Sequence, residues 1–232
     1  MLATKPTVLI VGASRGLGLA LAEQFCRRNW HVIATVRSAS SGLDVLKARF
    51  PDSLEEATVD IADEITVHAL RQRLAGRIID MVLVNAGIAK STTKTPGDAP
   101  EEHFLDIMLV NAFSPIRLIE IVDDLVSPEG SIVAMSSELG SISLNDGAFV
   151  WDLYASSKAA LHMLMKCYSA RHAQDKRAKL LVVPGWIRTD MGGPEATLAI
   201  DEAIPLVVDT LVKNHGKPGL RYLDRFDNDL PW

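Results

Sequence analysis

Gly12-Ala13-Ser14-Arg15-Gly16-Leu17-Gly18 joins an apolar run at residues 7–11 to a segment of helical periodicity at 17–28. A short apolar run rich in β-branched residues is typical of a buried strand. Apolar residues at helical spacing then form one stripe that can pack on a sheet, namely Leu17, Ala20, Leu21 and Phe25. The three glycines between these elements predict a tight turn that lets the backbone approach a ligand closely.

The helix after this turn begins with unpaired backbone N–H groups and the positive end of its dipole. Both features suit an anion, most often a dinucleotide pyrophosphate. A glycine-rich turn can also be a plain connector between a strand and a helix. The position of this one, at the first strand of an alternating chain, favours cofactor binding by Gly12, Ser14, Arg15, Gly16, Leu17 and Gly18.

The composition is that of an ordinary globular protein. The chain has 232 residues and a net charge of −5 without a basic block, so nucleic acid and anionic membranes are poor partners. No apolar run reaches membrane-spanning length, and the first strand begins too early for a targeting segment, which predicts a cytoplasmic protein. The six histidines lack ligand spacing, so no metal site is expected. Cys26 and Cys167 lie among apolar neighbours and are expected to be buried free thiols.

Short apolar runs alternate with longer amphipathic segments, which predicts an α/β fold with a parallel sheet wound with helices. Strands are expected at 7–11, 31–36, 56–59, 79–84, 131–135, 179–183 and 220–223, and helices at 17–28, 40–49, 65–74, 100–126, 153–173 and 197–213. Pro115 is expected to kink the long helix, whose core candidates are Phe104, Ile107, Met108, Ile119 and Val122. No linker interrupts residues 1–232, which are therefore expected to form one domain.

The residue after the second strand meets the adenosine ribose in folds of this type. An acidic side chain there accepts a hydrogen bond from a 2′-hydroxyl, whereas an arginine pairs with a 2′-phosphate. Arg37 occupies this position, and Arg15 in the glycine turn could reach the same phosphate. Either arginine alone is more often a solvated surface charge, but the two together predict NADP(H) rather than NAD(H).

Tyr154 and Lys158 are four residues apart, which places both side chains on one face of a helix. Reduction of a carbonyl requires a proton at the oxygen as hydride arrives. A free tyrosine, with a pKa of about 10, is a poor proton donor at neutral pH. A nearby ammonium would favour the phenolate and lower the tyrosine pKa, so the pair indicates acid–base catalysis. Considered alone, a Tyr/Lys pair at this spacing is usually the polar face of an amphipathic helix.

The chain resembles the short-chain dehydrogenase/reductase family through GxxxGxG at 12–18, Asn85-Ala86-Gly87, and Tyr154 with Lys158, in this order. The resemblance implies a Rossmann-type, doubly wound parallel sheet of seven strands with helices on both faces. Asp60 would hold the adenine amino group with the Ile61 N–H on a ring nitrogen, although Asp60 could instead cap a helix. Further cofactor contacts would come from Asn85, Ala86, Gly87, Val110, Pro184, Gly185, Ile187 and Thr189.

The resemblance also implies a catalytic serine after the fifth strand and a water-holding asparagine, Asn111. Ser137 is the preferred serine because a strand end positions a side chain better than a loop does. It lies 17 residues before Tyr154, a longer interval than is common in the family, so Ser141 and Ser143 remain alternatives. Trp186, Met191, Phe149 and Trp151 are candidates for the substrate pocket, and residues 191–195 for a mobile lid.

The long interval, the run at 185–193 and the ending Leu-Asp-Arg-Phe-Asp-Asn-Asp-Leu-Pro-Trp232 are similar to C-factor and Sniffer-type carbonyl reductases. The resemblance implies NADPH-dependent reduction of a ketone or aldehyde to an alcohol. The alternatives are a nucleotide-binding signalling protein with incidental turnover, and another enzyme on this scaffold, such as an epimerase or an NAD-dependent alcohol dehydrogenase. Family members commonly form dimers or tetramers through the long helices, so a homodimer or homotetramer is expected.

Overall fold

A seven-stranded parallel sheet forms the centre of the computed structural model, which describes residues 5–147 and 150–232. The strands are β1 (Thr7–Val11), β2 (His31–Val36), β3 (Leu54–Thr58), β4 (Ile79–Val84), β5 (Val126–Met135), β6 (Ala178–Val183) and β7 (Gly219–Asp224). Their spatial order is β3-β2-β1-β4-β5-β6-β7, and every neighbouring pair is parallel. The predicted doubly wound Rossmann-type sheet is therefore confirmed.

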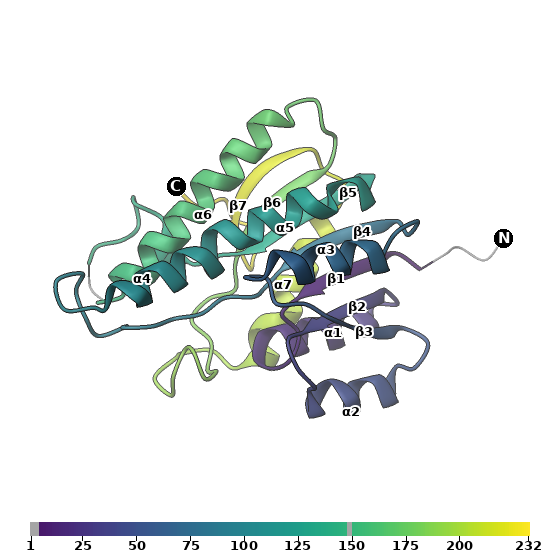
Figure 1. Cartoon of the computed structure of the whole chain (residues 1–232), viewed down its shortest axis with the longest axis horizontal. Helices are drawn as coiled ribbons and strands as arrows, with labels where there is room; N and C mark the ends of the chain where they lie inside the picture. Colours follow the sequence, from purple (N-terminus) through teal and green to yellow (C-terminus); the bar gives the residue numbers. More distant parts are fainter. Residues whose placement is uncertain (1–4, 148–149) are drawn as a thin grey trace.

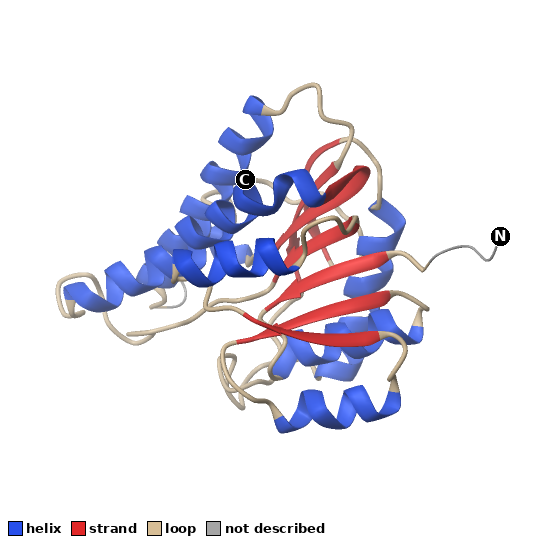
Figure 2. Ribbon diagram, turned by 45° about the vertical axis from the view of Figure 1, so that its right-hand side comes forward, coloured by secondary structure: helices blue, strands red, loops and turns tan. Residues whose placement is uncertain are grey.

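Helices cover both faces of this sheet (Figures 1 and 2). They are α1 (Gly16–Arg27), α2 (Ser41–Arg49), α3 (Glu64–Arg73), α4 (Glu101–Met108), α5 (Ser114–Val122), α6 (Asp152–Arg171) and α7 (Ile200–Asn214). Successive residues of β1 point to opposite faces, as strand geometry requires. Val8 and Ile10 join the apolar core beneath α1 and α7, whereas Leu9 and Val11 join the core beneath α3, α5 and α6. Two cores thus hold the sheet in place.

The predicted continuous helix over 100–126 is wrong in one respect. It is divided into α4 and α5 by a π-helical turn, Leu109–Phe113, and ends in a 3-10 turn, Asp123–Leu125. The irregularity immediately precedes Pro115, which lies in the first turn of α5. Pro115 has no N–H to donate to the carbonyl of Asn111 four residues earlier, so the α-helical bonding pattern cannot continue through this turn.

Two predicted burials are also wrong. Phe104 is 42% exposed, because α4 extends beyond the carboxyl ends of the strands and has no sheet beneath it (Figure 1). Cys26 is buried as expected, but Cys167 is exposed, because it lies off the stripe of α6 that faces the core. The other core candidates of the long helix are buried, except Met108, which is half-buried.

The chain order reverses between the adjacent strands β1 and β4. The connections after these two strands leave in opposite directions, which opens a crevice at the carboxyl ends of the strands. This crevice contains the candidate active site.

Candidate active site

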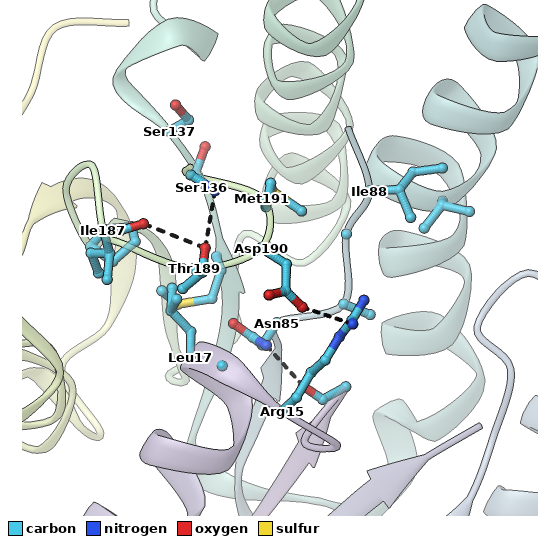
Figure 3. Close-up of a pocket in the computed structure, with 18 of the residues that line it drawn as sticks. Arg15, Leu17, Asn85, Ile88, Ser136, Ser137, Ile187, Thr189, Asp190 and Met191 are labelled. Carbon is cyan, nitrogen blue, oxygen red and sulfur yellow. Dashed lines mark hydrogen bonds and ion pairs between the residues drawn. The ribbon is translucent and has the colours of Figure 1, made fainter. Parts of the chain in front are cut away.

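A cavity of 1020 Å³ occupies the carboxyl edge of the sheet (Figure 3). It joins the glycine turn, the ends of β2 and β4, the Tyr154 face of α6 and the loop after β6. The predicted residues that line it are Gly12, Ser14, Arg15, Gly16, Leu17, Arg37, Asp60, Ile61, Asn85, Ala86, Gly87, Val110, Ser137, Tyr154, Lys158, Pro184, Gly185, Ile187 and Thr189. Gly18 and Asn111 lie behind its wall. One continuous space thus brings together the two halves of the predicted site.

The glycine turn is packed so closely that side chains are excluded at two positions. Gly12 has φ +90°, and a Cβ there would lie 2.9 Å from the backbone of Ala86. A Cβ on Gly18 would lie 1.9 Å from the carbonyl oxygen of Gly12. The amide of Asn85 donates to that same carbonyl at 2.8 Å, so the end of β4 fixes the turn (Figure 3).

The start of α1 has the character of an anion site. Arg15 is its N-cap, and the first turn contains no acidic residue. The Arg15 side chain makes no capping hydrogen bond within the described chain. The first-turn N–H groups therefore stay directed at the cavity, where the helix dipole adds positive potential.

The two arginines predicted to bind a phosphate differ in their surroundings. Arg37 follows β2, lines the cavity and is exposed, and its guanidinium has no ion pair or hydrogen bond with the described residues. Arg15 instead pairs with Asp190 at 2.8 Å, a contact between the glycine turn and the loop after β6 (Figure 3). No local sequence pattern predicts this pair, because the two residues are 175 positions apart.

Asp60 lines the cavity, as its predicted role requires, but it does not cap α3. Its Oδ1 accepts a hydrogen bond from the Ala62 N–H at 2.9 Å. The N-cap is Asp63, which accepts from the Ile65 N–H at 2.9 Å. The helix-cap interpretation therefore applies to the residue three positions later.

Tyr154 and Lys158 lie on one side of α6, with the Lys158 Nζ 5.6 Å from the centre of the Tyr154 ring. The ammonium donates to the carbonyl oxygen of Met135 at 3.0 Å. Burial lowers the pKa of Lys158 to about 8. Burial also raises the pKa of Tyr154 to about 12, against an opposing hydrogen bond with the Ser137 side chain. The expected lowering of the Tyr154 pKa is thus absent, because desolvation of the phenolate outweighs the other influences.

Among the three candidate serines, Ser137 alone lines the cavity. Its hydroxyl caps the 3-10 turn Glu138–Gly140 by accepting from the Leu139 N–H at 3.2 Å. Ser141 and Ser143 donate instead to the carbonyl oxygens of Pro231 and Trp232, at 2.6 and 2.9 Å. Geometry therefore favours Ser137.

The Asn111 side chain is buried and occupied by local contacts. Its amide accepts from the Ile88 N–H and donates to the Ile88 carbonyl, both at 2.8 Å, and also donates to Ser157 at 3.1 Å. Asn111 therefore fixes the segment after β4 against α6. This contact also explains Gly87, where a Cβ would lie 3.3 Å from the Asn111 Oδ1.

The loop after β6 is held by its own polar contacts. Thr189 accepts from the Gly192 N–H at 3.0 Å, and the Trp186 indole donates to the Gly192 carbonyl at 2.9 Å. Trp186 and Met191 line the cavity as predicted, and Trp151 also lines it with its ring edge-on to Tyr154 at 5.3 Å. Phe149 lies outside the described residues.

Some residues of the cavity wall were not predicted from the sequence. The Thr35 hydroxyl accepts from the Gly12 N–H at 3.1 Å and so supports the glycine turn. A threonine inside the apolar run of β2 was the available signal. Arg225 also lines the cavity and packs over Phe226 at 4.3 Å, but nothing in the sequence near it indicated this.

Two features are absent from residues 5–147 and 150–232. No group of three or more His, Cys, Asp or Glu side chains in these ranges could hold a metal ion. No helix there is long and apolar enough to cross a membrane.

The sheet order and the glycine turn define a doubly wound, nucleotide-binding type of fold, and Tyr154 and Lys158 line its cavity. The sequence model of the short chain dehydrogenase family matches residues 6–197, and the chain belongs to this family.

Several solved structures resemble the chain over its whole length. A protein from Burkholderia multivorans, described as a short-chain dehydrogenase/reductase with bound NADP, is 44% identical, with a TM-score of 0.96 over 99% of this chain and 100% of that one. A carbonyl reductase from Pseudomonas aeruginosa in complex with NADP is 33% identical, with a TM-score of 0.88 over 99% and 100%. In sequence, the chain is also similar to C-signal of Myxococcus xanthus, with 29% identity over 66% of this chain and 93% of the length of C-signal. These relatives support the carbonyl reductase-like group within the family.

Proposed function

We propose that this protein uses NADPH to reduce a ketone or aldehyde to an alcohol. The observation that carries the proposal is the single cavity, in which the glycine turn and Arg37 lie at one end and Ser137, Tyr154 and Lys158 at the other. The NADP bound to the two structural relatives supports the choice of cofactor.

The residues present fit such a cofactor. Gly12 and Gly18 leave no room for side chains and so keep the turn tight, and the N–H groups at the start of α1 would bind a pyrophosphate. Arg37, whose guanidinium has no ion pair with the residues that the structure describes, would provide the cation for a 2′-phosphate. Asp60 and Ile61 would hold the adenine, and the segment from Asn85 to Gly87 the nicotinamide ribose. Pro184, Gly185, Ile187 and Thr189 would hold the carboxamide, and Val110 would be a further cofactor contact.

The chemistry that NADPH supplies when bound is hydride transfer to the carbonyl carbon. The hydroxyl of Ser137 donates a hydrogen bond to the carbonyl oxygen and orients it. Tyr154 gives its phenolic proton to the same oxygen, so the carbonyl becomes an alcohol and the tyrosine a phenolate. The Lys158 ammonium stabilises that phenolate, and Asn111 keeps the neighbouring wall in place. These residues supply position and charge.

The apolar and aromatic side chains of the cavity wall support an apolar or aromatic carbonyl compound as the substrate. Its wall contains Trp151, Trp186, Leu139, Met191 and Ile88. Such a wall binds a substrate by burial of apolar surface, while Ser137 and Tyr154 fix the one polar group. Ring-bearing ketones and aldehydes are therefore the compounds to screen first.

The test is a fluorescence titration of NADPH and NADH against the wild type and Arg37→Ala. An arginine–phosphate contact is charge-assisted, so we expect the variant to lose about tenfold or more in NADPH affinity with little change for NADH. Arg49→Ala, which removes another exposed arginine that does not line the cavity, is the control. Equal affinity of the wild type for both nucleotides would contradict the choice of NADP(H). Binding of neither would overturn the proposed function.

A further inference from the structure

The end of β5 is held by three side chains in succession. Lys158 donates to the carbonyl oxygen of Met135 at 3.0 Å. The next residue, Ser136, shares a buried hydrogen bond of 2.5 Å with the Nε2 of His162. The carbonyl oxygen of Ser137 then accepts from the Tyr222 hydroxyl at 2.8 Å. The backbone that carries the Ser137 hydroxyl is thus fixed from behind at each residue.

His162 occupies a particular place on α6. It lies one helical turn beyond Lys158 and two turns beyond Tyr154, so all three share one side of the helix. The imidazole is 5% exposed and lies behind the wall of the cavity, which it does not line. His162 therefore acts on the site through Ser136 and not by touching a substrate.

The turn after Ser137 rests directly on this side of α6. A Cβ on Gly140 would lie 2.8 Å from the Cβ of Lys158 and 2.9 Å from the Cε1 of His162. The absence of a side chain at Gly140 therefore lets the serine segment contact the lysine and the histidine at once.

The imidazole is enclosed by aromatic rings from the end of the chain. Its ring lies 4.5 Å from that of Tyr222 and 5.6 Å from that of Trp232. The segment after β7 folds back on this strand, with the Leu230 N–H donating to the Tyr222 carbonyl at 2.8 Å. Ser141 ties the serine segment to the same region through the carbonyl oxygen of Pro231.

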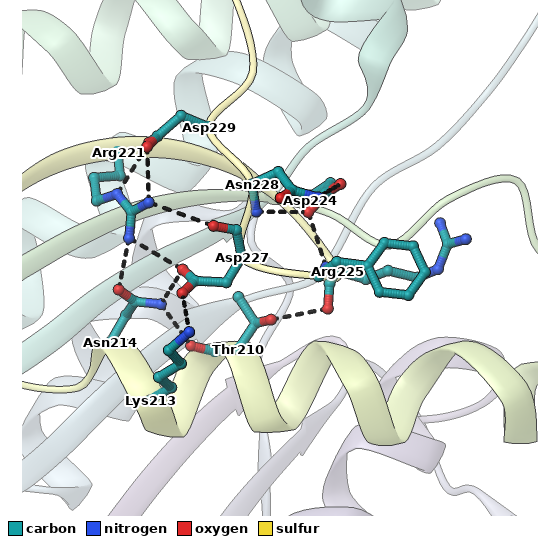
Figure 4. Close-up of polar contacts among 10 residues, drawn as sticks. Thr210, Lys213, Asn214, Arg221, Asp224, Arg225, Asp227, Asn228 and Asp229 are labelled. Carbon is teal, nitrogen blue, oxygen red and sulfur yellow. Dashed lines mark hydrogen bonds and ion pairs between the residues drawn. The ribbon is translucent and has the colours of Figure 1, made fainter.

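A polar cluster holds this reversal of the chain (Figure 4). Arg221 of β7 pairs with Asp227 at 3.0 Å and with Asp229 at 2.9 Å. Lys213 and Asn214 of α7 contact the same Asp227, at 2.6 and 2.7 Å. The aromatic residues behind the serine segment are thus anchored to both β7 and α7.

The hydrogen bond between His162 and Ser136 involves a neutral imidazole at physiological pH. Burial lowers the pKa of His162 to about 4, and the positive charge of Lys158 acts in the same direction. The imidazole therefore keeps one acceptor and one donor nitrogen, and it adds no second cation beside Lys158.

We propose that His162 is a positioning residue, which holds Ser136 and thereby keeps the Ser137 hydroxyl in hydrogen-bonding contact with Tyr154. The contacts stand independently of the reaction, but their consequence for turnover rests on the function proposed above. A fixed donor pair is what carbonyl reduction requires, because small displacements of catalytic groups reduce rates strongly.

The kinetic test compares His162→Phe with His162→Gln. Phenylalanine keeps the aromatic packing but removes the nitrogen, whereas glutamine can return a polar atom to Ser136. For His162→Phe we expect kcat to fall about tenfold, with the carbonyl KM and the NADPH Kd within about twofold of wild type. His162→Gln should regain most of the loss. His172→Phe, the same exchange at the far end of α6, is the control and should leave kcat unchanged.

A kcat of His162→Phe within twofold of wild type would overturn the positioning role. So would a His162→Gln variant as slow as His162→Phe, because restoring the polar atom would then have no effect.

A second measurement needs no turnover. The chain has three tyrosines, so a protein labelled with ¹³C at the tyrosine Cζ gives three signals, and Tyr154→Phe assigns the one at the site. We expect His162→Phe to shift the Tyr154 signal, His162→Gln to return it, and His172→Phe to affect Tyr168 instead. An unmoved Tyr154 signal in His162→Phe refutes the inference even if carbonyl reduction is observed. The expected shifts in a protein that reduces no carbonyl support the inference and reject the proposed function.

Discussion

Burial acts in opposite directions on the two ionisable residues at the centre of the site. The pKa of Tyr154 is raised to about 12, so its hydroxyl is protonated at neutral pH and ready to donate. The pKa of Lys158 is lowered to about 8, so its ammonium begins to lose its proton just above neutrality. The lysine, rather than the tyrosine, therefore sets the alkaline limit for reduction.

At the residue scale, we predict that kcat/KM for carbonyl reduction is constant below pH 7 and falls as pH rises through about 8. The value of kcat/KM falls as pH rises because the charged form of Lys158 exists only below its pKa. This charged form stabilises the phenolate that is left after proton transfer. Measurement of kcat/KM between pH 6 and 10 checks this prediction. Lys158→Arg stays charged over this range, so the decrease above pH 8 should disappear, although kcat/KM should be lower than that of the wild type. Tyr154→Phe should lower kcat/KM at least about a hundredfold, while the variant still binds NADPH. A wild-type rate that stays constant to pH 10 would contradict this role of Lys158.

At the scale of elements, the start of α1 and the loop after β6 are joined across the cavity by Arg15 and Asp190. Both side chains are more than three-quarters exposed, at 76% and 78%, so the pair adds little to stability. Its carboxylate, however, lies next to the part of the cavity where cofactor phosphates would bind. Asp190 therefore opposes an anion and occupies an arginine that could otherwise bind one.

Asp190→Asn is accordingly expected to tighten NADPH binding by about twofold to fivefold at low ionic strength, with the gain lost at high salt. The Kd from fluorescence titration at two salt concentrations measures this. The control is Asp209→Asn, because Asp209 pairs with Arg28 at the other end of α1 and is also exposed. Weaker NADPH binding by Asp190→Asn would show that the carboxylate helps to hold the cofactor, contrary to the prediction.

The sequence predicted the elements well where side-chain periodicity determines them. The apolar run of β1, expected to be a buried strand, and the apolar stripe of α1 both appear in the structure, where Val8 and Leu21 meet in one core. The π turn at Asn111 was missed, because a change of hydrogen-bonding register leaves the apolar pattern almost unaltered. The start of β5 at Val126 was also missed, since Pro128 and Gly130 interrupt its apolar run.

The candidate site was predictable to the extent that it consists of short local motifs. The glycine turn and the spacing of Tyr154 and Lys158 are such motifs, and their residues line the cavity except Ala13 and Gly18. The ion pair of Arg15 and the support of the serine segment by Tyr222 were not predictable. Both depend on contacts between distant segments, and no local pattern encodes which exposed acid or which buried ring lies opposite.

At the scale of the whole molecule, α4, the π turn and α6 carry large apolar side chains in contact with water. Their exposed fractions are 57% for Leu105, 52% for Phe113 and 61% for Met163. Large exposed apolar side chains on these helices are a feature of interfaces between protein chains, so we propose a homodimer or homotetramer formed through these helices. Sedimentation velocity should show that the wild type is larger than a monomer. Phe113→Asp should dissociate the assembly, because burial of a carboxylate without a partner is costly.

Ile65→Asp, at a 79% exposed position on α3, is the control and should leave the assembly intact. A monomeric wild type at micromolar concentration would refute the interface, and loss of assembly in both variants would place it elsewhere.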